Sequence, residues 1–469
     1  MTAARAEHPV LWLGAAAALG AYAAFLALVP QTLAVPAAIA PVVVLIAWWT
    51  LARPSRWVMA FLLCALLLPP LPIALGNTGP HPALIFAALG LFAGVLRMPE
   101  WKVRPDALTS ALMAYFLILT ASLAPAAWNS GVTIAAASLA RVLLLGVSLY
   151  VFFYTAYGPS AAEKRDDFPQ ARILFWCGTI SALFACLDFY FQFPAPAGFG
   201  PQFVWLSSGV YRRAQGVFYE ASTLGNLCAF FLTMIAVAMV RPKRETGLPR
   251  WSLLAGGAVF SAALIFSYSR ASVFNLVIAL ATLLYLRQPR GRRRRTAAVA
   301  LTSIFAGAAV AYFSFPRFFE AYLWRWRGSA EYLLESPARI LSGRWENWSV
   351  LGQYMSHHPL TALVGVGYKT LPYSNVLGRP VVADNMYLSL LVETGVAGVT
   401  ALLWLNWSIL RAAYRAARRP GAVTSFHGTW IFCFWMGQVV QMASGDLLTY
   451  WRVLPLYLWV LAVAVRESA

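Results

Sequence analysis

The chain has 469 residues, of which 60% are hydrophobic and only 11% are charged. A soluble globular domain carries roughly 25% charged residues, so this composition excludes a water-soluble fold. The formal net charge of +19 would suit a nucleic-acid partner only if the basic residues were clustered on one domain. They are instead distributed between long apolar runs, so we expect an all-α protein surrounded by membrane lipids, with no nucleic acid bound.

The apolar runs predict a polytopic bundle that occupies the whole chain, residues 1–469, as one transmembrane domain. A helix needs about 20 apolar residues to cross the hydrocarbon core. Several runs are short or contain proline, so the number of crossings is about 12 to 14. The first run has no cleavage site before the next span, and we expect it to be retained rather than removed as a signal peptide. The candidate spans are residues 10–29, 33–51, 57–75, 83–96, 107–124, 132–154, 173–193, 221–240, 251–267, 271–286, 296–315, 386–410, 426–443 and 447–465.

The loops orient the bundle, because Lys and Arg accumulate on the cytoplasmic side. With the N-terminus inside, the inner loops hold 24 of the 36 basic residues, the outer loops hold 11, and Arg141 lies within a helix. Both termini are therefore predicted to be cytoplasmic, in a bacterial inner membrane. The run Arg292 to Arg295 is predicted to anchor the topology on anionic lipid. The five cysteines lie in apolar segments without CxxC spacing, so neither a metal site nor a disulfide framework is predicted.

The later outer segments differ from the early ones, which are short and almost uncharged loops at 30–32, 76–82 and 125–131. The loop 194–220 carries Arg212, Arg213 and Glu220, and a tight turn carries Arg270. The segment 316–385 is predicted to be a large periplasmic loop with helices near 318–335 and 339–355, followed by an irregular stretch that leads to Asp384. Outer arginines oppose the topology rule, so their presence requires a function.

Arginines on the outer face predict an anionic lipid head group as ligand, and a diphosphate suits them best. Guanidinium groups bind phosphate oxygens in pairs and stay charged at any accessible pH. Arg213, Arg270 and Arg344 come from three separate segments, and Arg212 lies beside the first of them. Arg141 is ionisable at membrane depth, which makes it a functional candidate by default.

Several segments together resemble the O-antigen ligase and polymerase superfamily. These are Arg213-Ala-Gln-Gly216-Val-Phe-Tyr-Glu220, Ser267-Tyr-Ser-Arg270, Gly343-Arg344-Trp345, His358-Pro359 with Gly365-Val-Gly367, Asp384-Asn385-Met-Tyr387, and Glu393-Thr-Gly395. The resemblance covers residues 213–410. It implies a membrane-embedded glycosyltransferase fold of the GT-C-like kind, which moves a glycan from undecaprenyl diphosphate to an acceptor sugar hydroxyl at the periplasmic face, without a metal or other cofactor. The acceptor is a growing glycan or the lipid A-core.

The resemblance also implies roles for these residues in a single inverting displacement. Arg213, Arg270 and Arg344, with Arg141 and Arg212, hold the diphosphate leaving group. The O-antigen ligases usually have His where this chain has Asp384, so Asp384 takes the place of the base, with Glu220 as its rival. Asn385, His358 and Glu393 belong to the matching motifs and are expected to support the site. Ligation and polymerisation of O-antigen or exopolysaccharide both remain open.

Simpler interpretations stand beside these. The outer arginines, Arg452 included, can be interfacial anchors, Arg344 can pair with Glu346, and Arg141 can pair with Asp188. Asp384 and Glu220 can each start a helix as its cap. His358 can merely face the membrane interface. For the whole chain, the alternatives are a flippase for lipid-linked oligosaccharides and a structural subunit of an envelope-assembly complex; we see no internal repeat of the kind that transporters show.

Overall fold

The computed structural model describes residues 41, 44–71, 79–162, 168–196, 198–206, 209–241, 247–287, 312–313, 320, 322–323, 327 and 344–466. The predicted spans 10–29 and 296–315, the run Arg292 to Arg295 and most of residues 316–343 lie outside this described part.

Most of the described residues are helical and very few are in strands, which confirms the predicted all-α, polytopic membrane fold. Six helical stretches are long and apolar enough to cross a membrane, and four shorter apolar helices accompany them. The helices are α3 (Arg56–Leu67), α4 (Ala83–Leu96), α5 (Ala107–Ala121), α6 (Leu123–Ser130), α7 (Val132–Tyr157), α8 (Phe168–Phe191), α9 (Ala221–Met239), α11 (Arg250–Phe266), α12 (Arg270–Arg287), α16 (Arg344–His357), α17 (Thr361–Val364), α18 (Met386–Arg418), α19 (Ala422–Gln441) and α20 (Leu454–Val465). Short 3₁₀ turns are η1 (Met98–Glu100), η2 (Pro159–Ala162), η3 (Gly216–Phe218), η4 (Met442–Ser444) and η5 (Leu447–Thr449).

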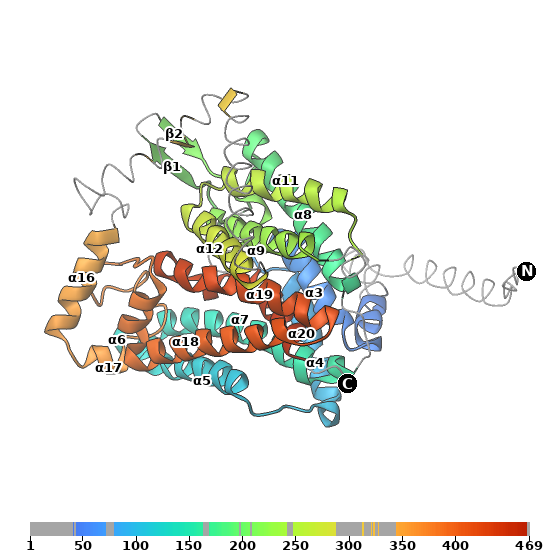
Figure 1. Cartoon of the computed structure of the whole chain (residues 1–469). Helices are drawn as coiled ribbons and strands as arrows, with labels where there is room; N and C mark the ends of the chain where they lie inside the picture. Colours follow the sequence, from blue (N-terminus) through green and yellow to red (C-terminus); the bar gives the residue numbers. More distant parts are fainter. Residues whose placement is uncertain are drawn as a thin grey trace, which may run out of the picture.

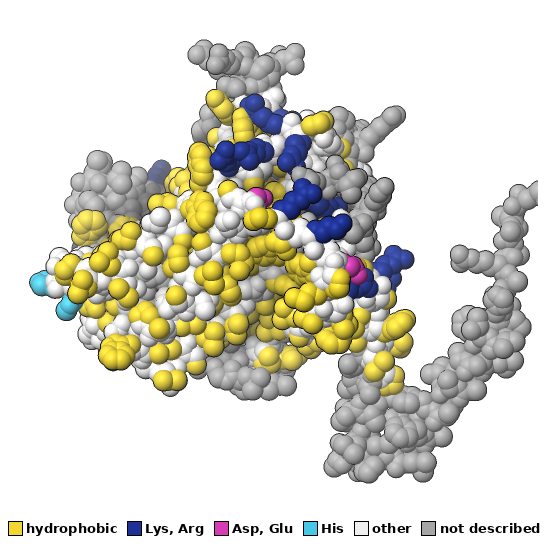
Figure 2. Space-filling model, turned by 90° about the horizontal axis from the view of Figure 1, so that it is seen from below, with side chains coloured by type: hydrophobic (Ala, Val, Ile, Leu, Met, Phe, Trp, Pro, Cys, Tyr) yellow, Lys and Arg dark blue, Asp and Glu magenta, His cyan; other side chains and the backbone are white. Residues whose placement is uncertain are grey.

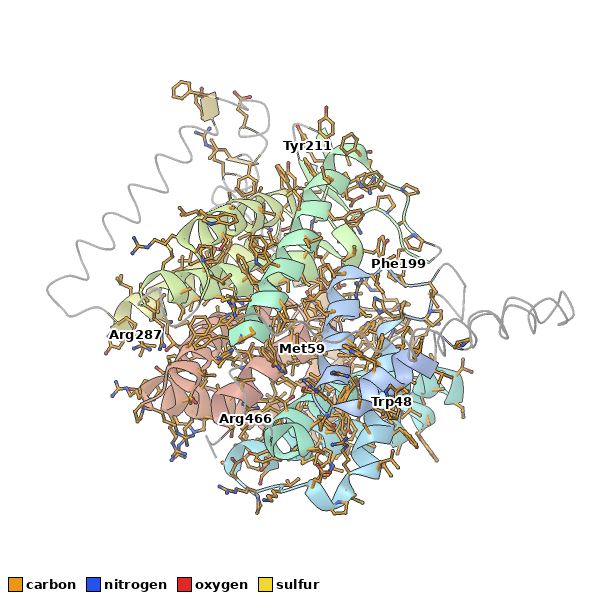
Figure 3. All side chains as sticks on the ribbon, turned by 90° about the vertical axis from the view of Figure 1, so that its right-hand side faces the viewer. Trp48, Met59, Phe199, Tyr211, Arg287 and Arg466 are labelled. Atoms are coloured by element: carbon orange, nitrogen blue, oxygen red, sulfur yellow. The ribbon has the colours of Figure 1, made fainter. Side chains whose placement is uncertain are left out.

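Most of these helices run side by side, as Figure 1 shows. Helices α9, α12 and α19 pack against one another, α18 lies against α19 and α5, and α20 lies against α7 and α19. The start of α18 and helix α16 lie at the end of the bundle away from the C-terminus (Figure 1). Figure 3 looks from the opposite end, where Arg287 ends α12 and Arg466 follows α20.

A small hairpin interrupts the loop between α8 and α9. Strands β1 (Phe203–Leu206) and β2 (Gly209–Arg212) pair antiparallel, and Phe203 is opposite Arg212. The hairpin is not among the predicted elements, because alternation of apolar and polar residues over four positions is too short a signal. Strand β2 ends directly before Arg213. The hairpin therefore fixes the backbone position of Arg213.

The span boundaries differ from the predictions where proline and turn residues act. The span predicted at 57–75 ends at Leu67, because Pro69 and Pro70 follow and cannot continue the helix. The predicted loop 125–131 is instead largely helix α6, and the span predicted from residue 447 begins only at Leu454. Helix α18 continues to Arg418 and contains a break at Gly395, where φ is 69°.

Hydrogen bonds between buried side-chain amides connect the helices whose ends carry the candidate site. Asn226 and Asn275 each donate to both Gln438 and Gln441 over 2.8–3.1 Å, and Tyr457 donates to Asn226 over 2.7 Å. Hydrogen bonds of this kind between helices replace water that the hydrocarbon core cannot supply. They fix α9, α12, α19 and α20 relative to one another, and therefore also fix the loops at their ends.

The described surface is that of a membrane protein. In Figure 2 hydrophobic side chains cover much of the visible face, and the basic ones gather toward the side on which the C-terminus lies in Figure 1. Trp48, Trp128 and Trp407 are among the large apolar side chains that are exposed. Such a surface suits contact with lipid rather than water.

Candidate active site

Arg213 follows strand β2 and ties the hairpin loop to the turn before α12. Its backbone N–H donates to the carbonyl of Gln202 over 2.9 Å, and its Nε donates to the carbonyl of Ser267 over 2.8 Å. Burial lowers the pKa of the guanidinium, a nearby Glu220 opposes this shift, and the charge of Arg270 adds to it. Arg213 therefore lies among charged groups from two other segments.

Arg270 and Arg344 extend this group of cations. Arg270 is the first residue of α12 and Arg344 is the first residue of α16, and the two guanidinium groups are close enough to interact electrostatically. Arg213, Arg270 and Arg344, here called the arginine cluster, are thus linked in a row. Like charges at short range repel, so such a cluster favours anions beside it.

One anion in the structure is Asp384, whose Oδ2 lies 3.2 Å from Nε of Arg344. Asp384 has a left-handed backbone with φ of 47°, which Asp tolerates better than most residues. The side chain of Asn385, not that of Asp384, caps α18 by accepting from the N–H of Leu388 over 3.1 Å. The alternatives in which Asp384 is the cap, or Arg344 pairs with Glu346, are therefore wrong.

Glu220 is the second carboxylate of this region. It precedes α9 as the N-cap residue, but its side chain makes no capping hydrogen bond; instead the Thr223 hydroxyl donates to Oε2 over 2.7 Å. Burial raises the pKa of Glu220. The hydrogen bond from Thr223 and the positive charges of Arg213 and Lys369 lower this pKa, but by less than burial raises it. The side chain is therefore free of helix capping and is a stronger proton acceptor than an ordinary glutamate.

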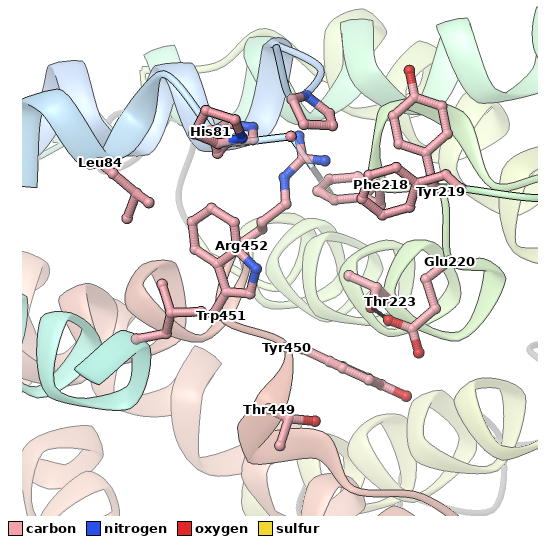
Figure 4. Close-up of a pocket in the computed structure, with 15 residues that line it drawn as sticks. His81, Leu84, Phe218, Tyr219, Glu220, Thr223, Thr449, Tyr450, Trp451 and Arg452 are labelled. Atoms are coloured by element: carbon pink, nitrogen blue, oxygen red, sulfur yellow. Dashed lines mark hydrogen bonds between the residues drawn. The ribbon is translucent and has the colours of Figure 1, made fainter. Parts of the chain in front are cut away.

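A cavity of about 420 Å³ opens next to Glu220. Figure 4 shows Glu220 and Trp451 on different sides of it, with Tyr450 extending toward the glutamate. The lining comes from six segments: the residues after α3, the start of α4 with the loop before it, α7, the loop after α8, the turn η3 with the start of α9, and the segment before α20. The lining residues are Pro70, Gly79, Pro80, His81, Leu84, Leu144, Phe199, Phe218, Tyr219, Glu220, Thr223, Thr449, Tyr450, Trp451 and Arg452. No residue of the arginine cluster lines the cavity. Glu220 lines it and also interacts with Arg213, so Glu220 lies between the cavity and the arginine cluster.

A partly buried ion pair that is not among the predicted site residues involves the residue Asp446, which precedes the cavity-lining residues Thr449 to Arg452 in the chain. Lys369, in the loop before α18, pairs with Asp446, in the loop before α20. Burial opposes the charge of Lys369, but the carboxylates of Asp446 and Glu393 outweigh it and raise its pKa. Only the position of Asp446 and Lys369 in outer loops flanked by apolar spans could have signalled the pair.

Arg141 holds the same loop. Its Nη1 donates to the carbonyl of Lys369 over 3.3 Å, and its guanidinium lies over the ring of Tyr373, 4.4 Å from the centroid. The alternative pairing of Arg141 with Asp188 is wrong, because Asp188 pairs with Arg212 over 3.3 Å. Arg141 and Arg212 are thus engaged in contacts outside the arginine cluster.

Glu393 and the glycines of the matching motifs form a packing contact. A Cβ on Gly365 would lie 2.3 Å from the carbonyl oxygen of Glu393, and one on Gly395 would lie 2.2 Å from that of Leu363. Both glycines have positive φ. The Gly367 N–H also donates to the Glu393 carbonyl over 2.8 Å. These glycines therefore serve close backbone packing of the loop on α18.

His358 lies apart from these contacts. It follows α16, is exposed, and its ring contacts Tyr354 with centroids 4.7 Å apart. The interfacial alternative describes this position better than a supporting role in the site.

Arg452 is buried rather than interfacial, contrary to the anchor alternative. Its guanidinium donates to the carbonyls of Ala65 and Leu68, at 2.7–3.0 Å, and to that of Val217. Ala65 and Leu68 belong to the last turn and the cap of α3, where carbonyls lack helical partners and a cation is favoured. Burial lowers the pKa of Arg452 to about 9.

Comparison with known proteins agrees with the motifs. Residues 255–403 match the family described as O-antigen ligase. This match includes Arg270, Arg344 and Asp384. No curated protein matches the chain. Within the described residues, no group of three or more His, Cys, Asp or Glu side chains is placed to hold a metal ion. Over the matched segment, this multi-pass membrane protein is similar to the O-antigen ligase family.

Proposed function

We propose that the protein transfers a glycan from undecaprenyl diphosphate to a sugar hydroxyl at the periplasmic face of the bacterial inner membrane. The arginine cluster carries this proposal. Arg213, Arg270 and Arg344 begin or precede three different helices, yet their guanidinium groups interact in a row. A diphosphate would neutralise this row and accept several charge-assisted hydrogen bonds from it.

The reaction forms one bond and breaks one. An acceptor oxygen attacks the anomeric carbon as the bond from that carbon to the diphosphate oxygen breaks, and undecaprenyl diphosphate leaves with the electron pair. A carboxylate takes the proton of the attacking hydroxyl, and the anomeric configuration inverts. The arginine cluster stabilises the charge that develops on the diphosphate, which is the kind of electrostatic help that often supplies the largest part of catalysis. No step requires a metal.

Two carboxylates compete for the role of base. Asp384 pairs with Arg344, and its side chain is about half exposed, at 48%. Glu220 has its pKa raised by burial, lies next to Arg213 and lines the cavity. A proton acceptor works best when its pKa approaches the working pH, which favours Glu220. In this scheme Asp384 holds Arg344 in place against the diphosphate.

The test is transfer in vitro with purified protein, undecaprenyl-diphosphate-linked glycan and a defined acceptor. A longer glycan indicates polymerisation and a lipid A-linked product indicates ligation. Arg270→Ala and Glu220→Gln should strongly reduce the formation of both products while the protein still elutes as a folded, monodisperse species. The matched control is Arg411→Ala, which removes an exposed arginine from α18. Full activity in Arg270→Ala would refute the assignment, and movement of intact lipid-linked glycan across proteoliposomes without bond formation would indicate a flippase.

A further inference from the structure

The segment from Asp446 to Arg452, here called the strap, is fixed at both ends. Asp446 pairs with Lys369 at one end, and Arg452 donates to carbonyls of α3, its cap residue and η3 at the other. Between these anchors, Thr449, Tyr450 and Trp451 face the cavity. The wall that they form is therefore preorganised, which reduces the entropic cost of binding a ligand against it.

The opposite wall is also held in a special conformation. Tyr219 has a left-handed backbone with φ of 55°, which is uncommon for a bulky residue. Gln215 donates to the Tyr219 carbonyl over 2.8 Å, and the ring of Tyr219 lies 5.0 Å from that of Phe199. Backbone strain of this kind persists where the surroundings enforce it, and it is frequent at ligand sites.

The chemistry of the lining indicates an uncharged, hydroxyl-rich ligand. Aromatic rings of Phe199, Phe218, Tyr219 and Trp451 offer apolar faces, while hydroxyl groups and one carboxylate, Glu220, offer polar contacts. A pyranose ring presents C–H groups on its faces and hydroxyls around its edge, so it matches both kinds of contact. The volume of about 420 Å³ lies in the range of roughly 300–1,000 Å³ that is usual for small-molecule sites.

Neither a diphosphate nor a polyprenyl chain fits this lining as well. Among the described residues that line the cavity, Arg452 is the one Lys or Arg, and its donors already point at backbone carbonyls. Both ring nitrogens of His81 are also engaged, with the Leu68 carbonyl and the Ala83 N–H. A polyprenyl chain would surround the Glu220 carboxylate with hydrocarbon and leave it a single hydrogen bond, from Thr223, among the contacts described above, which is a costly environment for a charge.

We propose that the cavity between the strap and η3 binds the terminal sugar ring of the acceptor glycan, with Trp451 as its aromatic platform. This inference rests on the proposed function and adds to it where the acceptor lies. Glu220 borders both the cavity and the arginine cluster, so a hydroxyl of the bound ring that reaches Glu220 also faces the diphosphate side. Tyr450 lines the cavity and extends toward Glu220 (Figure 4), so it lies on the Glu220 side of the proposed acceptor site.

Labelling of an engineered cysteine tests binding without requiring transfer. Thr449→Cys, in a full-length background with the five native cysteines replaced, is treated with a methanethiosulfonate reagent. The probes are lipid-free repeat-unit oligosaccharide, lipid-free core oligosaccharide, and undecaprenyl diphosphate without glycan. One of the oligosaccharides should slow labelling several-fold, while undecaprenyl diphosphate should not. Ser356→Cys, on the exposed part of α16, is the control and should label at one rate under all conditions.

Kinetics then separate the acceptor site from the donor site. Trp451→Ala should raise the KM for the acceptor about tenfold, which is the scale of one lost aromatic contact, with the KM for the donor unchanged. Trp407→Ala, which removes an exposed tryptophan from α18, should change neither value. An acceptor KM that is unchanged in Trp451→Ala would overturn the inference.

The two proposals fail in different ways. Protection of the thiol in Thr449→Cys by undecaprenyl diphosphate and not by oligosaccharide would overturn the acceptor site while leaving glycan transfer in place. Protection by oligosaccharide in a protein that performs no transfer would overturn the proposed function and leave a glycan-binding cavity. Transfer together with equal labelling rates for all probes would overturn the acceptor site alone.

Discussion

Nε of Arg344 lies 3.2 Å from Oδ2 of Asp384, and this contact joins the first residue of α16 to the residue before the cap of α18. The pair connects two helices that are separated in sequence by an irregular loop. It also places a carboxylate beside the arginine cluster, where it orients the guanidinium of Arg344.

Reversal of this pair distinguishes a structural bridge from a substrate contact. If the pair only holds α16 against α18, the double variant Arg344→Asp with Asp384→Arg should restore the activity lost in each single variant. We expect no restoration, because an aspartate at position 344 would repel the diphosphate. The measurement is a double-mutant cycle on kcat/KM for transfer, with folded yield as the control. Recovery to the wild-type rate would assign the pair a purely structural role.

The pH profile tests Glu220. Burial raises its pKa above the ordinary glutamate value, and a general base acts only when deprotonated, so activity should rise with pH through this raised pKa. The acid limb of kcat/KM should therefore lie at higher pH than for an unperturbed glutamate. Glu220→Gln should remove the limb and lower the rate by about 10²–10⁴-fold.

Arg213 supplies a second check on the same limb. Its charge lowers the pKa of Glu220, so Arg213→Gln should move the acid limb further toward high pH as well as weaken donor binding. A limb that stays at one pH in Arg213→Gln would show that Glu220 is not the group that titrates.

Gly365→Ala should destabilise the protein strongly. The added Cβ would lie 2.3 Å from the carbonyl oxygen of Glu393, and the positive φ of 79° at this glycine adds backbone strain. Strain in this region of φ alone costs of order 1–3 kcal/mol. The check is the thermal unfolding midpoint of the detergent-solubilised protein. Gly352→Ala is the matched control, because its Cβ meets nothing within 4 Å in helix α16, and it should stabilise by roughly 0.5–1 kcal/mol.

Arg452→Lys should lower the unfolding midpoint although it keeps the charge. A lysine cannot reproduce the planar fork that reaches Ala65, Leu68 and Val217, so at least one buried carbonyl loses its partner. An unsatisfied buried group costs about 1–3 kcal/mol. Arg411→Lys on the exposed face of α18 should leave the midpoint unchanged. Equal midpoints in both variants would contradict the structural role of Arg452.

The sequence by itself determined the class of fold and the ends of many helices. Apolar runs of membrane length must form helices, because lipid offers no partners to backbone N–H and C=O groups. The span predicted at 83–96 coincides with α4, and that predicted at 221–240 differs from α9 by one residue. The motifs also located the arginines and the superfamily, since these depend on residue identity in local order.

Only the tertiary structure decided which charges meet. Arg212 pairs with Asp188, which the sequence had offered as an alternative partner of Arg141, because β2 brings Arg212 back to the end of α8. The pair of Lys369 and Asp446 joins residues 77 positions apart, and the cavity is assembled from six separate segments. Hydrophobic periodicity records whether a residue faces lipid or protein, but electrostatic contacts depend on distances between helix ends, which packing alone sets.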